Sequence, residues 1–320
     1  MSTGRSRWFA AVALIWISSL APFGVAHAVE TIAVLYPEVP EPERGLFNLI
    51  REGAKNAIES AGARSVELAI ADPEDKATLS NRVRESGATR ILLFGRRAYE
   101  ASAGLERQYP TFAAAVDLPV GRSSRVAGIT VYPDPAVVFK TLHLLAPRIE
   151  RVIIVVDQQS AGWLLDAAKV AAREERLDAV IHDARSRSDG AAANQAWNVL
   201  QYGNPDTDAL WVLNNTGYAN EDVLPELVAE SWRRHFLVFS NVVQHVREGA
   251  LFAVYLDPKG LGHRAGLQVL QTKQGAHEIV FLQDLDRAVN TRVAAHLELP
   301  VSGALANSFN LVLGRQGSND

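Results

Sequence analysis

Two adjacent arginines follow an apolar segment of the chain. Arg96 and Arg97 come directly after the run Arg90–Phe94 and open a helical pattern. A guanidinium is a planar group with a fixed positive charge, and it binds carboxylate or phosphate through two parallel hydrogen bonds. Cations at the start of a helix oppose the helix dipole, so their presence needs a reason. Either both are exposed residues of a helix start, or at least one binds an anionic group.

Polar residues follow a later apolar run, Ala209–Leu213. Asn214, Asn215 and Thr216 are of the types that cap helices and form turns, and the same types bind polar ligands at a helix start. Trp163 stands near the start of another predicted helix. Its indole either belongs to the core or forms a wall against which a ligand stacks.

The sequence motifs of common enzymes and metal centres are absent. The chain has no cysteine, which excludes disulfides, thiolate metal sites, iron–sulfur clusters and cysteine nucleophiles. It has no phosphate-binding G-x-x-x-x-G-K-[ST], no H-E-x-x-H and no G-x-S-x-G, and its eight histidines are scattered. We therefore expect a protein that is not an enzyme and that holds neither a cofactor nor a metal.

One glycine-rich segment supports an alternative. Gly260–Gly266 follows an apolar strand and opens a helix, which is the context of a dinucleotide-binding loop, and Asp284 follows the next strand, where a carboxylate binds the ribose. However, only one more strand is predicted after this segment, which is too little for a second mononucleotide-binding half. The favoured interpretation is a closely packed helix start, and a dehydrogenase is the alternative.

The first 28 residues have the three parts of a secretory signal peptide. Arg5 and Arg7 form a positive region, Trp8–Leu20 is apolar, and Ala26–Ala28 is a small-x-small cleavage site. The apolar run is shorter than the roughly 20 residues of a membrane-spanning helix. We expect cleavage after Ala28 and an exported chain that is not inserted in a membrane. Export without cysteines fits a bacterial periplasm.

The composition bounds the remaining possibilities. The 320 residues are 48% hydrophobic and 21% charged, which is typical of a globular protein with two domains. The formal net charge is −4, so no basic surface for nucleic acid is expected.

Short apolar strands and helical patterns alternate along the chain. The predicted strands of the first half are Thr31–Tyr36, Val66–Ala71, Arg90–Phe94, Thr111–Val116 and Val126–Val131. The alternation then restarts with strands Arg151–Val156, Ala179–His182, Ala209–Leu213, Phe236–Phe239 and Leu251–Leu256, followed by helix Asp257–Gln271 and strand Glu278–Leu282. This pattern predicts an α/β protein of two doubly wound parallel-sheet lobes joined by a hinge.

The joins between the halves are short and marked by proline. We expect the chain to cross between lobes near Gly128–Pro135, near Tyr255–Pro258 and between Leu282 and Asn290. The N-terminal lobe would contain residues 29–131 and 257–285, and the C-terminal lobe residues 132–256. Residues 286–320 would be a terminal helix and tail whose lobe the sequence does not assign.

Several short segments occur in the order in which one known family has them. They are Ile32–Tyr36, Arg51–Gly62, Ile91–Ala98, Val126–Thr130, Leu144–Ile154 and Val289–Pro300. In these segments the chain resembles the substrate-binding proteins of ABC transporters, in particular the tryptophan-binding type. The resemblance implies the type 1 periplasmic binding protein fold. It departs at Arg96 and Arg97, where the family has small hydroxyl residues, and at Asp157–Trp163, so the ligand of better-known members is not carried over.

In open α/β sheets, ligands bind beyond the carboxyl ends of the strands, so two such lobes would share one cleft. The residues that follow the strands are the candidate ligand-binding residues: Tyr36, Arg96, Arg97, Asp117, Gln159, Ser160, Trp163, Asn214, Asn215, Thr216, Ser240, Asn241 and Asp257. An unpaired buried arginine is costly, so an anionic ligand or an internal carboxylate must neutralise it. Asp117 is the first internal candidate and Glu38 the second.

The predicted function is a periplasmic receptor that binds a small anionic or zwitterionic ligand and delivers it to the membrane permease of an ABC transporter. We expect it to be a monomer. The alternative is a sensory or interaction component of the same fold, with a signalling or receptor partner and no transport role.

Overall fold

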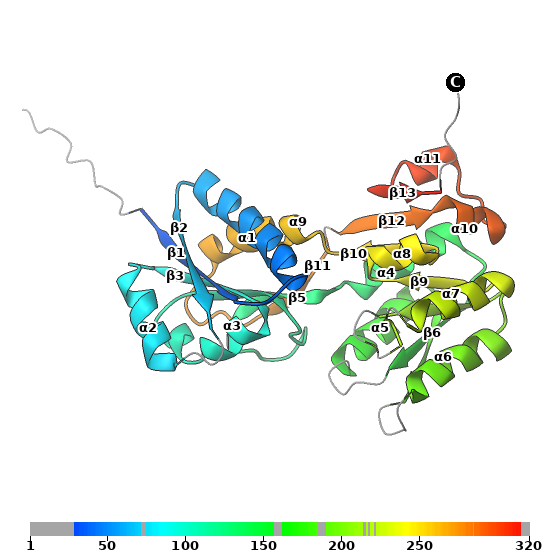
Figure 1. Ribbon diagram of the computed structural model, residues 1–320, viewed down its shortest axis with the longest axis horizontal. Helices are drawn as coiled ribbons and strands as arrows, with labels where there is room; N and C mark the ends of the chain where they lie inside the picture. The colour runs from blue at the N-terminus through cyan, green and yellow to red at the C-terminus, as the bar shows by residue number, and fades with distance from the viewer. Residues whose placement is uncertain are drawn as a thin grey trace, which may run out of the picture.

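The computed structural model describes residues 29–71, 75–156, 162–184, 190–213, 216, 218–220, 222–283 and 285–314. The predicted signal peptide lies outside them. Within this part of the chain, no helix is both long and apolar enough to cross a membrane. Strands and helices alternate along it, and Figure 1 shows them divided between two lobes, as the sequence predicted.

The first lobe contains a sheet of six parallel strands, counted over the described residues, in the order β11-β5-β4-β3-β1-β2. The strands are β1 (Thr31–Pro37), β2 (Arg64–Ile70), β3 (Arg90–Phe94), β4 (Thr111–Val116), β5 (Ala127–Pro133) and β11 (Ile279–Leu282). The helices are α1 (Glu43–Ser60), α2 (Lys76–Glu85), α3 (Gly95–Ala101), the 3-10 helix η1 (Leu105–Arg107) and α9 (Pro258–Gln271).

Both faces of this sheet are buried, which explains why its strands read as continuous apolar runs. In β1, Ile32 and Val34 belong to the core under α1 and α9, whereas Ala33 and Leu35 belong to the core under α2 and α3. Figure 1 shows the two pairs of helices on opposite sides of the sheet. The carboxyl ends of the strands are therefore the accessible edge where loops place functional side chains.

The second lobe contains a sheet of seven strands, again counted over the described residues, in the order β13-β12-β10-β9-β8-β6-β7. The strands are β6 (Arg151–Val156), β7 (Asp178–Asp183), β8 (Asp208–Val212), β9 (Leu237–Ser240), β10 (Phe252–Tyr255), β12 (Asp286–Asn290) and β13 (Leu311–Leu313). The helices are α4 (Pro135–Leu145), α5 (Gly162–Glu174), α6 (Ala191–Tyr202), α7 (Leu224–Arg233), α8 (Val243–Glu248), α10 (Thr291–His296) and α11 (Gly303–Ala306).

The last part of the chain differs from the predicted helix and tail. It contributes two strands to the second sheet besides helices α10 and α11, and β12 runs antiparallel to β10. In β12, only Ala288 and Val289 are fully buried apolar residues, so the segment lacks the long apolar run that marks the parallel strands.

The chain passes between the lobes at two sites with nearly the same sequence. Val131–Pro135 connects β5 of the first sheet to α4 of the second lobe, and Val254–Pro258 connects β10 of the second sheet to α9 of the first lobe; both read V-Y-x-D-P. In each, the aspartate caps the next helix: Asp134 accepts from the Ala136 N–H at 2.9 Å and Asp257 from the Gly260 N–H at 2.6 Å.

Each cap is followed by proline at the first helical position, where no N–H is needed. A helix start is thus fixed directly after each crossing. The third passage joins β11 to β12, and the side-chain amide of Gln283 lies 3.4 Å from the Asp134 carboxylate.

The glycines of Gly260–Gly266 serve a contact between helices. A Cβ atom on Gly262 would lie 1.8 Å from the backbone oxygen of Ile50, and one on Gly266 would lie 2.7 Å from that of Ala54. Gly53 of α1 faces α9 in the same way, since a Cβ atom there would lie 2.0 Å from the backbone oxygen of Lys259. The favoured interpretation of this segment, a closely packed helix start, therefore accounts for its glycines.

We predict that Gly262→Ala destabilises the fold by about 2 kcal/mol or more, because a methyl group has no space between the two backbones. Gly303→Ala is the matched control, since no atom lies within 4 Å of a Cβ there. That change should leave the free energy of unfolding within about 0.5 kcal/mol or raise it slightly. Urea unfolding measures both. Equal midpoints for the two variants would contradict the packing role.

Candidate functional site

Trp163, in the first turn of α5, connects the second lobe to strand ends of the first. Its ring centroid lies 5.7 Å from that of Tyr132 in an edge-on arrangement and 5.8 Å from that of Phe281. The indole also acts on the carboxylate of Asp117, whose pKa it lowers. Tyr132 belongs to β5, Phe281 to β11, and Asp117 follows β4. Trp163 is 8% exposed, so it is a packed contact between the lobes as well as a part of the candidate site.

Asp117 is the partly buried carboxylate at this contact. Burial raises its pKa above the ordinary value, and the nearby Arg96 charge and the Trp163 hydrogen bond oppose that rise without cancelling it. One of its oxygens, Oδ1, is buried and has no hydrogen-bond partner in the part of the chain that the structure describes. This oxygen is therefore closed to solvent and is not satisfied by a described group.

The two arginines have different surroundings. Arg96 is exposed, and its charge acts on Asp117, the carboxylate that the sequence analysis named as its first candidate partner. Arg97 donates from Nη1 to the backbone oxygen of Glu38 at 3.0 Å, so the second candidate partner is contacted through its carbonyl group. Of the two, Arg96 is the one placed beside the contact between the lobes.

Tyr36 lies at a separate cavity near the ends of β1 and β2. The guanidinium of Arg51 covers its ring, with Cζ 3.8 Å from the ring centroid, and also forms an ion pair with Glu67. The cavity, of about 330 Å³, is lined by Tyr36, Arg51, Phe47 and their neighbours. None of its lining residues contacts Trp163 or Asp117 among the described interactions, so Tyr36 is not joined to that group.

Ser240 is directed into the second lobe and is fully buried. Its hydroxyl donates to the backbone oxygen of Val212 at 2.9 Å and accepts from the N–H of Val242 at 3.1 Å. Nδ1 of His245 lies 2.7 Å from the same oxygen. With the hydroxyl proton directed to Val212, this ring nitrogen acts as the donor to the Ser240 oxygen.

Three other predicted residues mainly serve the fold, and four cannot be placed. Thr216 is buried and donates to the Leu213 oxygen at 2.8 Å, Asn241 is 9% exposed, and Asp257 caps α9. The predicted site residues that lie outside the described part are Gln159, Ser160, Asn214 and Asn215.

Three residues in or next to the candidate site were not among those predicted. Tyr132 and Phe281 pack against Trp163, and His245 supports Ser240. Tyr132 carried a usable signal, because it precedes the Pro-Asp-Pro of a predicted crossing. Phe281 lies inside a strand and His245 inside a short helix, and neither position follows a strand end.

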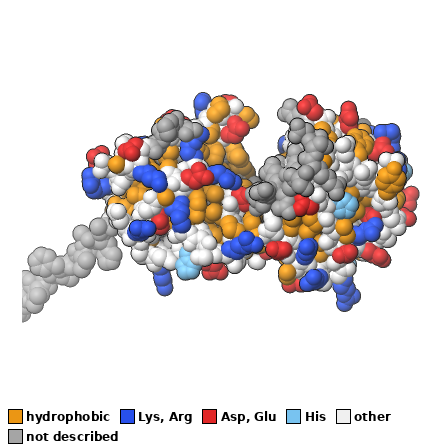
Figure 2. All heavy atoms as spheres, turned by 90° about the horizontal axis from the view of Figure 1, so that it is seen from below, with side chains coloured by type: hydrophobic (Ala, Val, Ile, Leu, Met, Phe, Trp, Pro, Cys, Tyr) orange, Lys and Arg blue, Asp and Glu red, His pale blue; other side chains and the backbone are white. Residues whose placement is uncertain are grey.

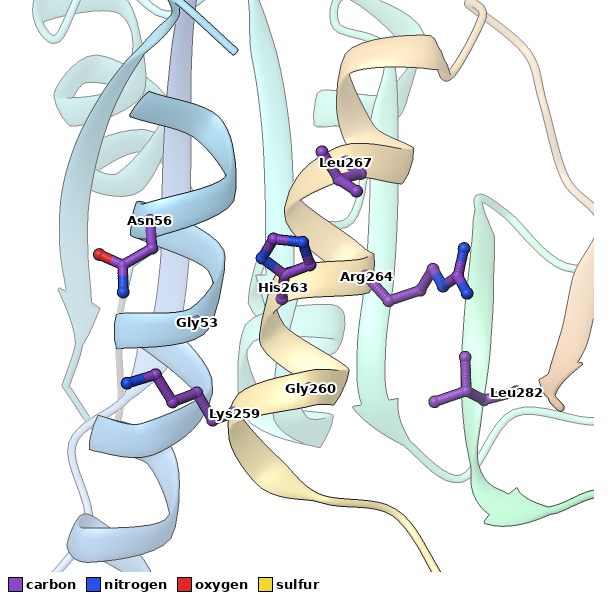
Figure 3. A pocket seen from close by; sticks show the side chains of 8 residues that line it. All are labelled: Gly53, Asn56, Lys259, Gly260, His263, Arg264, Leu267 and Leu282. Atoms are coloured by element: carbon purple, nitrogen blue, oxygen red, sulfur yellow. The ribbon is translucent and has the colours of Figure 1, made fainter. Parts of the chain in front are cut away.

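A further cavity, of about 440 Å³, lies between α1 and α9 in the first lobe. Figure 3 shows Lys259 pointing toward α1 and Arg264 pointing toward Leu282. Lys259 forms an ion pair with Glu52 at 2.5 Å. All its lining residues belong to elements of the first lobe, so this cavity is separate from the contact around Trp163.

Comparison with known proteins places the fold. No family model and no curated protein matches the chain. A substrate binding protein with adhesive properties from Clostridium difficile, in its ligand-free, open form, has a TM-score of 0.67 at 14% identity, over 90% of this chain and 100% of that one. The ABC domain from Streptococcus pneumonia in complex with L-Trp has a TM-score of 0.56 at 17% identity, over 89% and 100%. A LacI transcriptional regulator from Lactobacillus brevis has a TM-score of 0.53 at 13% identity, over 79% and 98%.

The chain has the type 1 periplasmic binding protein fold. The likeness extends over both lobes, since about nine-tenths of the chain is covered. Figure 2 shows the lobes as two bodies, with hydrophobic side chains gathered on the flank of the first lobe that faces the second. In this periplasmic binding protein fold, Asp117, Trp163 and Arg96 form the group of polar and aromatic side chains where the two lobes meet.

The buried imidazole of His245 predicts a pH dependence of stability. Burial lowers its pKa from 6.5 to about 4, so the unfolded chain binds a proton in this range that the folded chain rejects. The contribution is fully present above pH 6.5 and is lost as the pH falls toward 4, to a total of about 3 kcal/mol.

His245→Asn keeps a donor to Ser240 and removes the titrating ring. We expect the free energy of unfolding of this variant to fall less than that of the wild type between pH 6.5 and 4, measured by urea unfolding at each pH. His277→Asn changes an exposed histidine and should follow the wild type. Parallel pH curves for wild type and His245→Asn would refute the assignment.

Proposed function

We propose that the protein is a receptor for a small molecule, which binds where the two lobes meet. The observation that carries the proposal is the contact in which Trp163 of the second lobe packs on Tyr132 and Phe281 of the first, beside Asp117, whose pKa it lowers. A ligand bound beside this contact would touch both lobes at once. It would therefore stabilise one relative position of the lobes.

The ligand is proposed to be a small anionic or zwitterionic molecule. Arg96 is exposed beside the contact and supplies a planar cationic group suited to a carboxylate. The negative charge of Asp117 also favours a positive group on the ligand. A zwitterion therefore fits the site better than a simple anion does. The candidate residues Gln159, Ser160, Asn214 and Asn215 remain part of this proposal.

Delivery of the ligand to the permease of an ABC transporter is the proposed biological role. The solved structures from Clostridium difficile and Streptococcus pneumonia, described as a substrate binding protein and an ABC domain, support this role. The likeness to a LacI transcriptional regulator supports the alternative, a sensory component of the same fold without transport. Both roles require the same ligand-binding step, and neither requires an enzyme activity.

Export to the periplasm, with cleavage after Ala28, is proposed from the sequence. The positive, apolar and small-residue parts of residues 1–28 support it. A receptor of this kind would meet its ligand outside the cytoplasm. We propose that it acts as a monomer.

The direct test of the proposed function is a thermal-shift screen over amino acids, small carboxylates and nucleosides, followed by small-angle X-ray scattering. A ligand that binds only the folded chain raises the unfolding temperature, by an amount that grows with its concentration. We expect at least one compound to do so and to decrease the radius of gyration as the lobes close. A screen without any stabilising compound, in these classes and in sugars, would contradict the proposal.

The two arginines provide a matched pair for the charge preference. For a carboxylate ligand found in the screen, Arg96→Ala should weaken binding by about tenfold or more, because it removes the guanidinium beside the contact. Arg97→Ala should change the affinity little, since its guanidinium is directed to the Glu38 backbone. Isothermal titration calorimetry measures both. Wild-type affinity in Arg96→Ala would show that it is only a surface residue.

A further inference from the structure

The apolar core of the second lobe does not end at the boundary between the lobes. One cluster of buried side chains contains Trp163 of α5 and also Tyr132, which belongs to β5 of the first sheet. Phe281 of β11 and Val120, which follows β4, pack against this cluster as partly buried residues. Val120 packs against the first lobe's own core as well. Buried apolar contacts therefore join the lobes in addition to the three segments of chain that cross between them.

Trp163 is the centre of this contact. Its ring centroid lies 5.7 Å from that of Tyr132 with an interplanar angle of 69°, and 5.8 Å from that of Phe281 with an angle of 35°. Edge-on and tilted arrangements at these distances are favourable for aromatic pairs. Tyr132 directly precedes Pro133 of the first crossing, and Phe281 lies two residues before Gln283 of the third. One side chain of the second lobe thus packs on the strand ends that lead into two of the crossings.

The polar contacts in this region are weaker than the apolar one. Arg122 of the first lobe faces Asp166 of α5 at 4.0 Å, but 64% and 73% of these side chains are exposed. An ion pair so open to solvent contributes little. The amide of Gln283 lies 3.4 Å from the Asp134 carboxylate, and both of these residues belong to crossing segments. The aromatic contact is therefore the main interaction that opposes separation of the lobes here.

Such a contact decides whether the two lobes move freely. Domains joined by short segments and a small polar interface are expected to move relative to each other. Here that motion would separate the Trp163 indole from Tyr132 and Phe281 and would expose apolar surface to water, which is unfavourable. The chain itself therefore favours one relative position of the lobes.

We propose that Trp163 is an aromatic clamp that holds the two lobes in one relative position before a ligand binds. The clamp is a property of the ligand-free chain, so the inference goes beyond the proposed function and does not depend on the identity of a ligand. Trp163 is then a positioning residue, which sets the space between the lobes through Tyr132 and Phe281. Its exposure of 8% fits a clamp better than a wall open to a ligand.

The test measures a distance between the lobes in the absence of ligand. Because the chain has no cysteine, spin labels can be attached at introduced cysteines alone. Glu85→Cys, at the end of α2, and Glu226→Cys, in α7, place one label on an exposed position of each lobe. Pulsed electron paramagnetic resonance then gives the distribution of distances between the labels, on the chain from Val29 onward. We expect a single narrow distribution for the otherwise unchanged chain and a clearly wider one for Trp163→Ala.

Phe281→Ala removes the clamp from the side of the first lobe. It leaves Trp163 and the core of the second lobe in place, so it decides the question even if Trp163→Ala does not fold. We expect it to widen the distribution as well. The double variant should be no wider than Trp163→Ala, because the contact is already lost in the single variant.

Phe47→Ala is the matched control. Phe47 is also a partly buried phenylalanine of the first lobe, but it packs against that lobe's core and lines the separate cavity at Tyr36. Its replacement should lower the urea unfolding midpoint and leave the distance distribution unchanged. A loss of stability alone therefore does not imitate the loss of the clamp.

Two results would overturn the clamp. One is a distribution in the unchanged chain that is as wide as in Trp163→Ala, and the other is a widening in the double variant equal to the sum of the two single ones. Either result leaves the receptor function open, because no ligand takes part in the measurement. A ligand screen without a stabilising compound would contradict the proposed function and leave the clamp as it is.

Discussion

Neither lobe of this protein is completed by a continuous stretch of chain, and the rest of the structure depends on that constraint. The first sheet needs β11, and the core on one face of it needs α9, yet both follow the whole of the parallel part of the second sheet in sequence. α9 packs beside α1 on the same face of the sheet, and Gly262 and Gly266 let the two helix backbones approach closely. This arrangement costs conformational entropy during folding, because residues far apart in the sequence must come together before the first lobe is complete.

The segments that cross between the lobes form a hinge with a well-defined backbone. Asp134 and Asp257 each start a helix immediately after the chain leaves a sheet, and proline at the next position fixes the backbone further. A cap directly at the crossing leaves few rotatable bonds between one lobe and the first helix of the other. Pro133 restricts the backbone of the first crossing more than Leu256 restricts that of the second.

The alternation of apolar runs and helical patterns was sufficient to predict two parallel sheets, because strands buried on both faces differ clearly in composition from the helices around them. The same signal fails at β12, where antiparallel pairing to β10 supports a strand with little apolar sequence of its own. The pattern of apolar residues also does not reveal the short helix α8. Its six residues are fewer than the window over which a helical periodicity can be recognised.

The candidate site was predictable to the extent that position after a strand decides function. Asp117, Arg96 and Trp163 were predicted in this way, and they lie at one contact between the lobes. Ser240 and Thr216 satisfied the same criterion, but their hydroxyls bond to the backbone of the second lobe. Short hydroxyl and amide side chains serve caps, turns and ligands equally well, so their type cannot distinguish these uses. Phe281 was missed because its contribution comes from a contact with the opposite lobe, which no local pattern contains, whereas Tyr132 could have been found from its place at a predicted crossing.

Burial and charge act against each other at Asp117, and this opposition is what gives the site a preference. Were the carboxylate exposed, solvent would satisfy both oxygens and no ligand group would be favoured over water. Were Arg96 bonded to it directly, the pair would be neutral and saturated. Instead, burial raises the pKa of Asp117, and the Arg96 charge and the Trp163 indole lower it only in part. One oxygen of the carboxylate is buried without a hydrogen-bond partner in the described part of the chain. The result is a partly buried negative charge where the two lobes touch, and a ligand bound beside it on both lobes would favour one position of the lobes over the others.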